Sequence, residues 1–179
     1  MLTSQLEILT TSIDNDFGKL NKLQLNWKPD KQSWSIGQCL HHLIVSNEKY
    51  IPALQDVING KHKNSFWQKV NPFTNYTGKE MIRTLGFVVV KKYKSPRIFL
   101  PTSSSVGGHI VSDFISHQQI LLSLFEKLVN PIYSKTIISS PVAGLITLRL
   151  EDAMNLIIAH EQRHINQALK VKIKPEFPQ

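Results

Sequence analysis

The sequence predicts an all-α protein, a bundle of four long helices in a single domain that spans residues 1–179. Four segments repeat apolar residues at steps of three and four, which is the spacing of one face of an α-helix. No series of alternating apolar and polar residues marks a set of strands. Almost fifty residues rich in Pro, Asn and Lys separate the second helix from the third. This connection can cross the whole bundle, so neighbouring helices need not be antiparallel.

The first two helices are predicted over Thr3–Leu23 and from Ser35 to Gly60. Gly60 is a plausible C-terminal stop, because glycine favours the backbone conformation that ends helices. Pro52 predicts a bend or a local irregularity in the second helix. Their apolar faces are formed by Leu6, Leu9, Ile13, Phe17, Leu20 and Leu23 in the first helix, and by Ile36, Cys39, Leu40, Leu43, Ile44, Ile51, Leu54 and Ile58 in the second.

The third helix is predicted to begin near His109 and to end before Pro131. The fourth spans Thr147–Lys170, with Thr147 as its N-cap and Asp152 as an acidic residue near its positive end. The long connection before the third helix contains two weaker signals. We expect one short helix near Lys79–Phe87, and Val88–Val90 is strand-like but has no partner strand.

Composition narrows the class of protein. The formal net charge of +8 comes from scattered basic residues that do not interleave with aromatic ones, a pattern that argues against a nucleic-acid partner. No apolar run approaches the length of about 20 residues that spans a bilayer, so no membrane partner is expected. No signal peptide is visible, and a single cysteine excludes a disulfide framework. We therefore expect a cytoplasmic protein.

The pair His160 and His164 on the fourth helix carries the clearest chemical signal. A four-residue step places two side chains on one face, one turn apart, where two imidazoles can chelate a divalent ion. The same quadrant of the helix holds Ala153, Ile157, Ala168 and Val171, so both rings point toward the core. The alternative is a pair of core histidines bonded to other side chains, and the spacing favours the metal.

The segment His160–His164 also matches the H-E-x-x-H signature of zinc metalloproteases. The rest of that pattern is missing, since only fifteen residues follow His164 and none supplies the expected third ligand. Glu161 is rotated by about 100° from His160, toward the side of the helix. The sequence therefore argues against a protease.

A third ligand is expected from another helix, and the sequence offers several candidates. They are His41, His42, His117 and His109, together with His62 in a loop. Periodicity does not choose between His41 and His42, because both flank the apolar stripe. It favours His117, which lies on the core face of the third helix.

Three segments resemble the DinB-like superfamily, including its YfiT-type branch. Trp34–Leu43 (WSIGQCLHHL) is similar to the motif W-S-x-x-E/Q-x-x-x-H-L, and His160–Gln167 to the closing H-x-x-x-H-x-x-Q. Lys94–Pro101 is similar to a segment that precedes the third helix in some members. The resemblance implies an up-down-down-up bundle and a metal site formed by His42, His160 and His164. It also implies one zinc or nickel ion per chain and a homodimer.

The chain departs from the family pattern at two positions. Gln38 stands where an acid is common, which weakens a hydrogen bond at the start of the helix, and Val45 stands where many members carry Asp. Neither change removes a ligand. His117, Gln167 and Glu161 are expected as contacts of the ligands or of a substrate, and Gln167 alternatively only packs.

Three imidazoles leave the charge of a divalent ion intact and a coordination position open, which favours chemistry over a structural role. By analogy with relatives, we expect a metal-dependent hydrolase or a transferase of a low-molecular-weight thiol that acts on a small molecule. The alternative is a non-enzymatic, stress-related binding protein with a structural metal and a basic surface. The sequence identifies no general base.

Overall fold

The computed structural model describes residues 1–85, 105–141 and 143–179, and this part of the chain is predominantly helical. Its helices are α1 (Leu2–Phe17), α2 (Lys22–Asn26), α3 (Ile36–Glu48), α4 (Ile51–Ile58), α5 (Phe66–Val70), α6 (Thr74–Leu85), α7 (Ile110–Leu128) and α8 (Leu150–Lys172), with a 3-10 turn, η2 (Pro131–Tyr133). Two short strands, β1 (Ile137–Ser139) and β2 (Thr147–Arg149), form an antiparallel pair. The all-α prediction therefore holds for most of the fold, and this small sheet is the exception.

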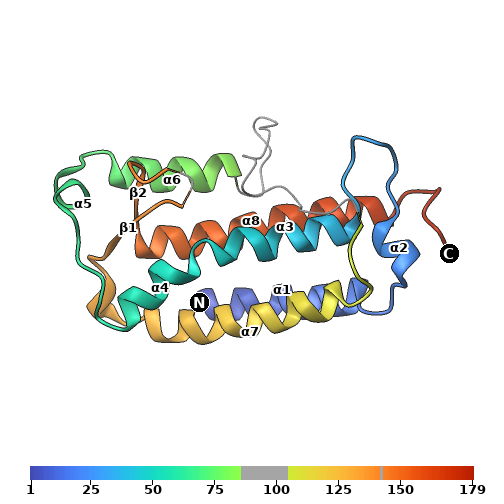
Figure 1. Cartoon of the computed structure of the whole chain (residues 1–179), viewed down its shortest axis with the longest axis horizontal. Coiled ribbons are helices and arrows are strands. Elements are labelled where there is room, and N and C mark those ends of the chain that lie inside the picture. Colours follow the sequence, from blue (N-terminus) through green and yellow to red (C-terminus); the bar gives the residue numbers. More distant parts are fainter. Residues whose placement is uncertain (86–104, 142) are drawn as a thin grey trace.

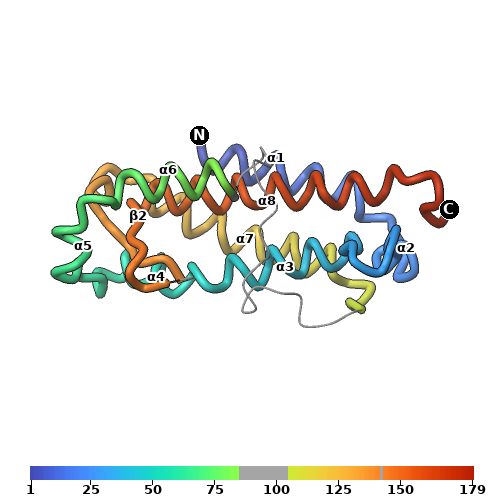
Figure 2. The backbone as a smooth tube through the Cα atoms, turned by 90° about the horizontal axis from the view of Figure 1, so that it is seen from above, coloured from blue at the N-terminus to red at the C-terminus, as the bar shows by residue number. Residues whose placement is uncertain are grey.

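The long helices lie side by side and share one apolar core. Helix α1 contacts α7 and α8, and α3 contacts the same two helices. Figure 1 shows α3 and α8 between α6 on one side and α1 and α7 on the other. In the perpendicular view of Figure 2, α6 runs along α8, against which it packs. The fully buried side chains at the centre include Phe17, Leu40, Phe114, Leu121 and Phe125.

The predicted first helix is broken in two. Helix α1 buries Leu6, Leu9, Ile13 and Phe17 as expected, but it ends at Phe17. Asn21 then caps α2 by accepting a hydrogen bond from the backbone N–H of Gln24, whose side chain accepts one from the backbone N–H of Asn21. Because this capping box starts a new helix, the first helix does not extend to Leu23 as predicted.

The second helix follows its prediction more closely. Ser35 caps α3 by accepting a hydrogen bond from the backbone N–H of Gln38 (3.1 Å), and the Gln38 Oε1 accepts one from Ser35 N (3.3 Å). Glutamine thus completes the capping box where an acid was expected. The helix is interrupted after Glu48, and Pro52 lies in the first turn of α4, the irregularity that it predicted. Gly60 ends the segment with a positive φ of 66°.

Helix α7 matches the predicted third helix, but the start of α8 was wrongly placed. Thr147 is not an N-cap, because it pairs with Ser139 between β2 and β1, and α8 begins only at Leu150. The buried Thr147 hydroxyl accepts a hydrogen bond from Asn71 Nδ2 (2.8 Å) and lies 2.6 Å from the Thr74 hydroxyl. These contacts, which come from Asn71 and Thr74 more than seventy residues earlier in the chain, stabilise β2.

The connection between α4 and α7 is more helical than expected. Helix α6 starts at Thr74, earlier than the predicted Lys79, and α5 was not predicted. Val88–Val90 and the segment Lys94–Pro101 lie outside the described residues. Among the helices that are described, none combines the length and the apolar character of a membrane span.

Candidate metal centre

Helices α3 and α8 lie side by side (Figure 1), and three imidazoles from these two helices meet between them. His42 comes from α3, and His160 and His164 come from successive turns of α8. One nitrogen from each ring can be chosen so that all three lie within 4.8 Å of one another. The Nε2 atoms of His42 and His160 are 3.3 Å apart. The ring centroids are separated by 4.5 Å to 5.0 Å.

Local sequence explains why these side chains meet. The Ser35 capping box fixes the first turn of α3, and His42 lies on the buried face of this helix between Cys39 and Leu43. His160 and His164 lie on the face of α8 that includes the buried Ile157 and Ala168. The apolar stripes of the two helices therefore bring the three rings into one place.

Burial keeps two of the rings neutral. It is the main cause that lowers the pKa of His164 to about 3, and the neighbouring His42 and Arg163 lower it further. Burial also holds the pKa of His160 well below its usual range, with smaller contributions from His164, His42 and Arg163. A metal ion binds histidine only in its neutral form. Both rings of α8 are therefore ready to bind a metal at neutral pH.

The geometry fits a divalent ion. Two ligands about 2.0–2.1 Å from a tetrahedral zinc lie about 3.3 Å apart, which matches the separation of the His42 and His160 Nε2 atoms (3.3 Å). His164 Nδ1 is buried and has no hydrogen-bond partner among the described residues. Such a nitrogen is costly to bury unless something binds it. The buried cluster could thus bind a metal ion.

Comparison with known proteins identifies the family of the chain. The family model of the DinB superfamily matches residues 5–168. The chain belongs to the DinB superfamily. Searches of curated proteins and of solved structures found no significant match. A three-histidine cluster that could bind a metal is consistent with membership in the DinB superfamily.

Trp34 forms one wall of the cluster in this DinB chain. Its ring lies 4.8 Å from the His42 ring, and it stacks on the His164 ring at 5.6 Å with an interplanar angle of 21°. The Ser46 hydroxyl lies 3.5 Å from His42 Nδ1, at the limit of a hydrogen bond. A partner on the second ring nitrogen orients a histidine ligand.

The other candidate ligands lie elsewhere in the described part of the chain. His41 is half-buried and is not in the cluster, although it is adjacent to His42. The exposed His109 lies 3.3 Å from Asp113, and His62 contacts the Asn64 side chain. His117 is buried as periodicity indicated, but it does not join the three rings. Burial lowers the pKa of His117, and Glu48 acts in the opposite direction.

Next to the cluster, both carboxylate oxygens of Glu161 are hydrogen-bonded to side chains of neighbouring helices. Its carboxylate is fully buried and accepts hydrogen bonds from Asn47 Nδ2 on α3 and from Gln118 Nε2 on α7, each at 2.7 Å. Burial raises the pKa of Glu161 to about 7, and the two amides act in the opposite direction. Glu161 thus ties α8 to two neighbouring helices. Asn47 and Gln118 were not predicted from the sequence, because single amides on an apolar face give only a weak signal.

Gln167 lies one turn beyond His164 and is half-buried. Its amide is close enough to act on the pKa of His164, in the direction opposite to burial. The influence of Gln167 on the pKa of His164 is consistent with the expectation that Gln167 lies beside a candidate ligand.

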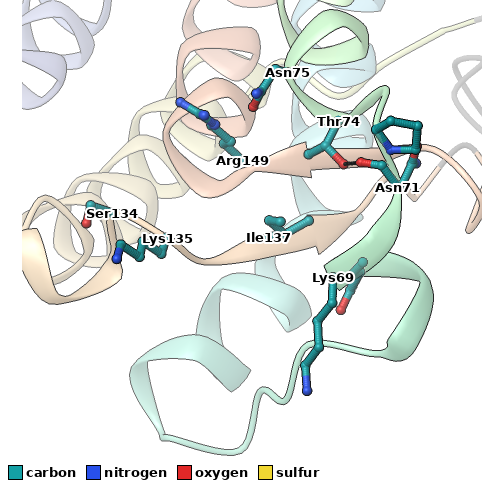
Figure 3. A pocket seen from close by; sticks show the side chains of 10 residues that line it. Lys69, Asn71, Thr74, Asn75, Ser134, Lys135, Ile137 and Arg149 are labelled. Carbon is teal, nitrogen blue, oxygen red and sulfur yellow. Dashed lines mark hydrogen bonds between the residues drawn. The ribbon is translucent and has the colours of Figure 1, made fainter.

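A separate pocket lies where α5, the start of α6 and the two strands meet (Figure 3). Lys69, Lys135 and Arg149 are among its lining residues, and Thr74 donates a hydrogen bond to the Asn71 carbonyl at its rim. None of the three clustered histidines lines this pocket. It is therefore distinct from the candidate metal centre.

Proposed function

We propose that His42, His160 and His164 bind one divalent ion, zinc or nickel, and that the chain is a metal-dependent enzyme. The observation that carries this proposal is the set of three converging rings without a fourth ligand. No other His, Cys, Asp or Glu of the described residues joins the group, and residues 86–104 and 142 contain none of these types. Three protein ligands with one open position are typical of catalytic zinc sites, whereas structural sites are closed by a fourth.

The residues around the cluster support this role. A divalent ion held there would supply a Lewis acid and lower the pKa of a bound water or thiol. Trp34 covers the His42 and His164 rings and limits the access of water from its side. Both oxygens of Glu161 accept hydrogen bonds from amides, so we do not assign it as a general base.

We propose hydrolysis, or transfer of a low-molecular-weight thiol, with a small molecule as substrate. The proposal includes one domain, an up-down-down-up helix bundle, a homodimer and a cytoplasmic location. The chain colours of Figure 1 support the bundle, since α1 and α8 run in one direction and α3 and α7 in the other. The alternative is a binding protein in which the metal only stabilises the fold, and the net charge of +8 favours an acidic partner for it.

Consumption of a thiol together with a small electrophile tests the proposal. The protein is treated with a chelator, dialysed and reloaded with zinc or nickel, and thiol loss is followed with and without the metal. His42→Ala removes a proposed ligand, and His41→Ala is the matched control on the adjacent position. We expect metal-dependent turnover in the parent and in His41→Ala only. Turnover that is identical in all three proteins and insensitive to the chelator would refute the proposal.

A further inference from the structure

Arg163 lies beside the candidate metal centre on α8 and is not one of its three candidate ligands. It follows His160 by three residues on α8, and side chains at this spacing are neighbours on a helix surface. Arg163 is half-buried, and its Nη1 donates a hydrogen bond to the backbone carbonyl of Thr84 near the end of α6 (3.1 Å). The guanidinium is therefore held close to the cluster by a neighbouring helix.

Among the residues that the structure describes, Arg163 has no acidic partner. None of the ion pairs between described residues includes it, and residues 86–104 contain no Asp or Glu. Glu80, one turn before Thr84, instead pairs with Arg83 at 2.6 Å. Glu161 is the nearest acid in sequence, and its two oxygens accept from Asn47 and Gln118.

The positive charge of Arg163 reaches the three-histidine cluster. Arg163 lies on α8 three residues after His160 and directly before His164, and the Thr84 carbonyl holds its guanidinium. Neutral imidazoles do not offset the charge of a bound divalent ion, so the filled site and Arg163 together would carry three positive charges. The buried Glu161 carboxylate next to the cluster offsets at most one of them. A site of this kind favours an anionic ligand.

We propose that Arg163 binds a carboxylate of the substrate, whose sulfur or oxygen donor occupies the open metal position. This inference rests on the proposed function and specifies its substrate class: a small thiol or related donor that also carries a carboxylate. The planar fork of arginine presents five N–H donors and matches a carboxylate. The contact to Thr84 uses one donor, so others remain for the substrate.

A structural role is the competing explanation. A cation near the C-terminal end of α6 stabilises that end of the helix, and Arg163 then only clamps α6 to α8. The two explanations differ in what they predict for the metal. Loss of a clamp would loosen the site and weaken metal and ligand alike, whereas loss of a substrate-binding cation would weaken only anionic ligands.

The test uses cobalt-substituted full-length protein and three thiols with a two-carbon spacer: 3-mercaptopropionate, 2-mercaptoethanol and cysteamine. Their dissociation constants are read from the visible cobalt spectrum. They are measured for the parent, for Arg163→Gln and for Arg163→Lys, which keeps a cation and a donor for Thr84. Arg149→Gln is the matched control, because Arg149 directly precedes α8 and lines the distant pocket of Figure 3. Comparing each thiol between proteins removes the intrinsic differences among thiols.

We expect Arg163→Gln to raise the dissociation constant of 3-mercaptopropionate about tenfold or more, because a charge-assisted hydrogen bond is lost. The affinity for 2-mercaptoethanol should change less than about twofold, and cysteamine should bind as well or better because a repulsive charge is gone. Cobalt itself should bind at least as tightly as in the parent, for the same reason. Arg163→Lys should give an intermediate loss for the carboxylate thiol, and Arg149→Gln no change.

Equal weakening of all three thiols, or weaker cobalt binding in Arg163→Gln, would overturn the inference in favour of the clamp. An Arg163→Lys protein that folds but shows the same uniform weakening leads to the same conclusion. If no thiol changes the spectrum of the parent, the open coordination position does not exist. The proposed function then fails together with the inference, and this outcome is distinct from the previous two.

Discussion

Replacing Glu161 with glutamine should change how the stability of the metal-free protein depends on pH. The Glu161 carboxyl is fully buried, and burial raises its pKa from 4.5 to about 7, against the effect of the Gln118 and Asn47 amides. The folded protein therefore holds this proton more tightly than the unfolded chain does. The resulting stability is fully present below pH 4.5 and is lost as the pH rises to about 7.

The size of the effect follows from the difference between the two pKa values. Each pH unit corresponds to about 1.4 kcal/mol, so the loss between pH 4.5 and 8 is about 3 kcal/mol. Glutamine has nearly the same shape but carries no titratable proton. The free energy of unfolding of Glu161→Gln, relative to the parent, should therefore rise by about 3 kcal/mol over this range. Contributions from the buried histidines are common to both proteins and cancel in the difference.

Urea unfolding in the presence of a chelator, at several values between pH 4.5 and 8, measures this difference. Glu126→Gln is the control, because Glu126 is exposed on α7. The free energy of unfolding of the control should differ from that of the parent by a constant amount between pH 4.5 and 8. A constant offset between Glu161→Gln and the parent would refute the account of Glu161 as a buried carboxylate whose proton is stabilised by burial.

Three further outcomes are expected. Ser35→Ala removes the N-cap of α3 and should lower the free energy of unfolding in urea by about 1 kcal/mol; an unchanged midpoint would show that the capping box is unimportant. Gly37→Ala places a methyl group against the Val106 side chain and 3.0 Å from the Leu25 carbonyl, and should cost about 1–3 kcal/mol in the same assay. Because burial lowers the pKa of His164 to about 3 and holds the pKa of His160 well below its usual range, protons should compete little with metal at these two residues at about pH 6. Competition with a coloured chelator checks this, and a loss of three protons per metal at pH 6 would contradict it.

The sequence predicted the helices best where local signals agree with the long-range packing. Ser35, Gly60 and Pro52 mark helix ends that local chemistry alone determines, and all three act as predicted. The strands β1 and β2 have three residues each, too few to show a period. Thr147 was assigned to a helix cap because threonine is common both in caps and in strands, and the actual partners of its hydroxyl come from residues more than seventy positions away.

The candidate site shows a similar limit. The four-residue step between His160 and His164 fixes two rings on one face of a helix, and the structure places them together. Periodicity also placed His117 on a core face, and this residue is indeed buried. It does not reach the cluster, because periodicity gives the face of a helix but not its position along the neighbouring helix. Only the family motif pointed to His42 rather than His41.

Metal content tests the central claim most directly, that His42, His160 and His164 together bind one divalent ion. Elemental analysis of the purified parent should give about one zinc or nickel per chain. Each of His42→Ala, His160→Ala and His164→Ala should lose it, because two imidazoles bind a divalent ion far more weakly than three. His41→Ala and His117→Ala, which alter histidines outside the cluster, should retain it. Full metal content in all three cluster variants, or loss of metal only in His41→Ala or His117→Ala, would contradict the claim.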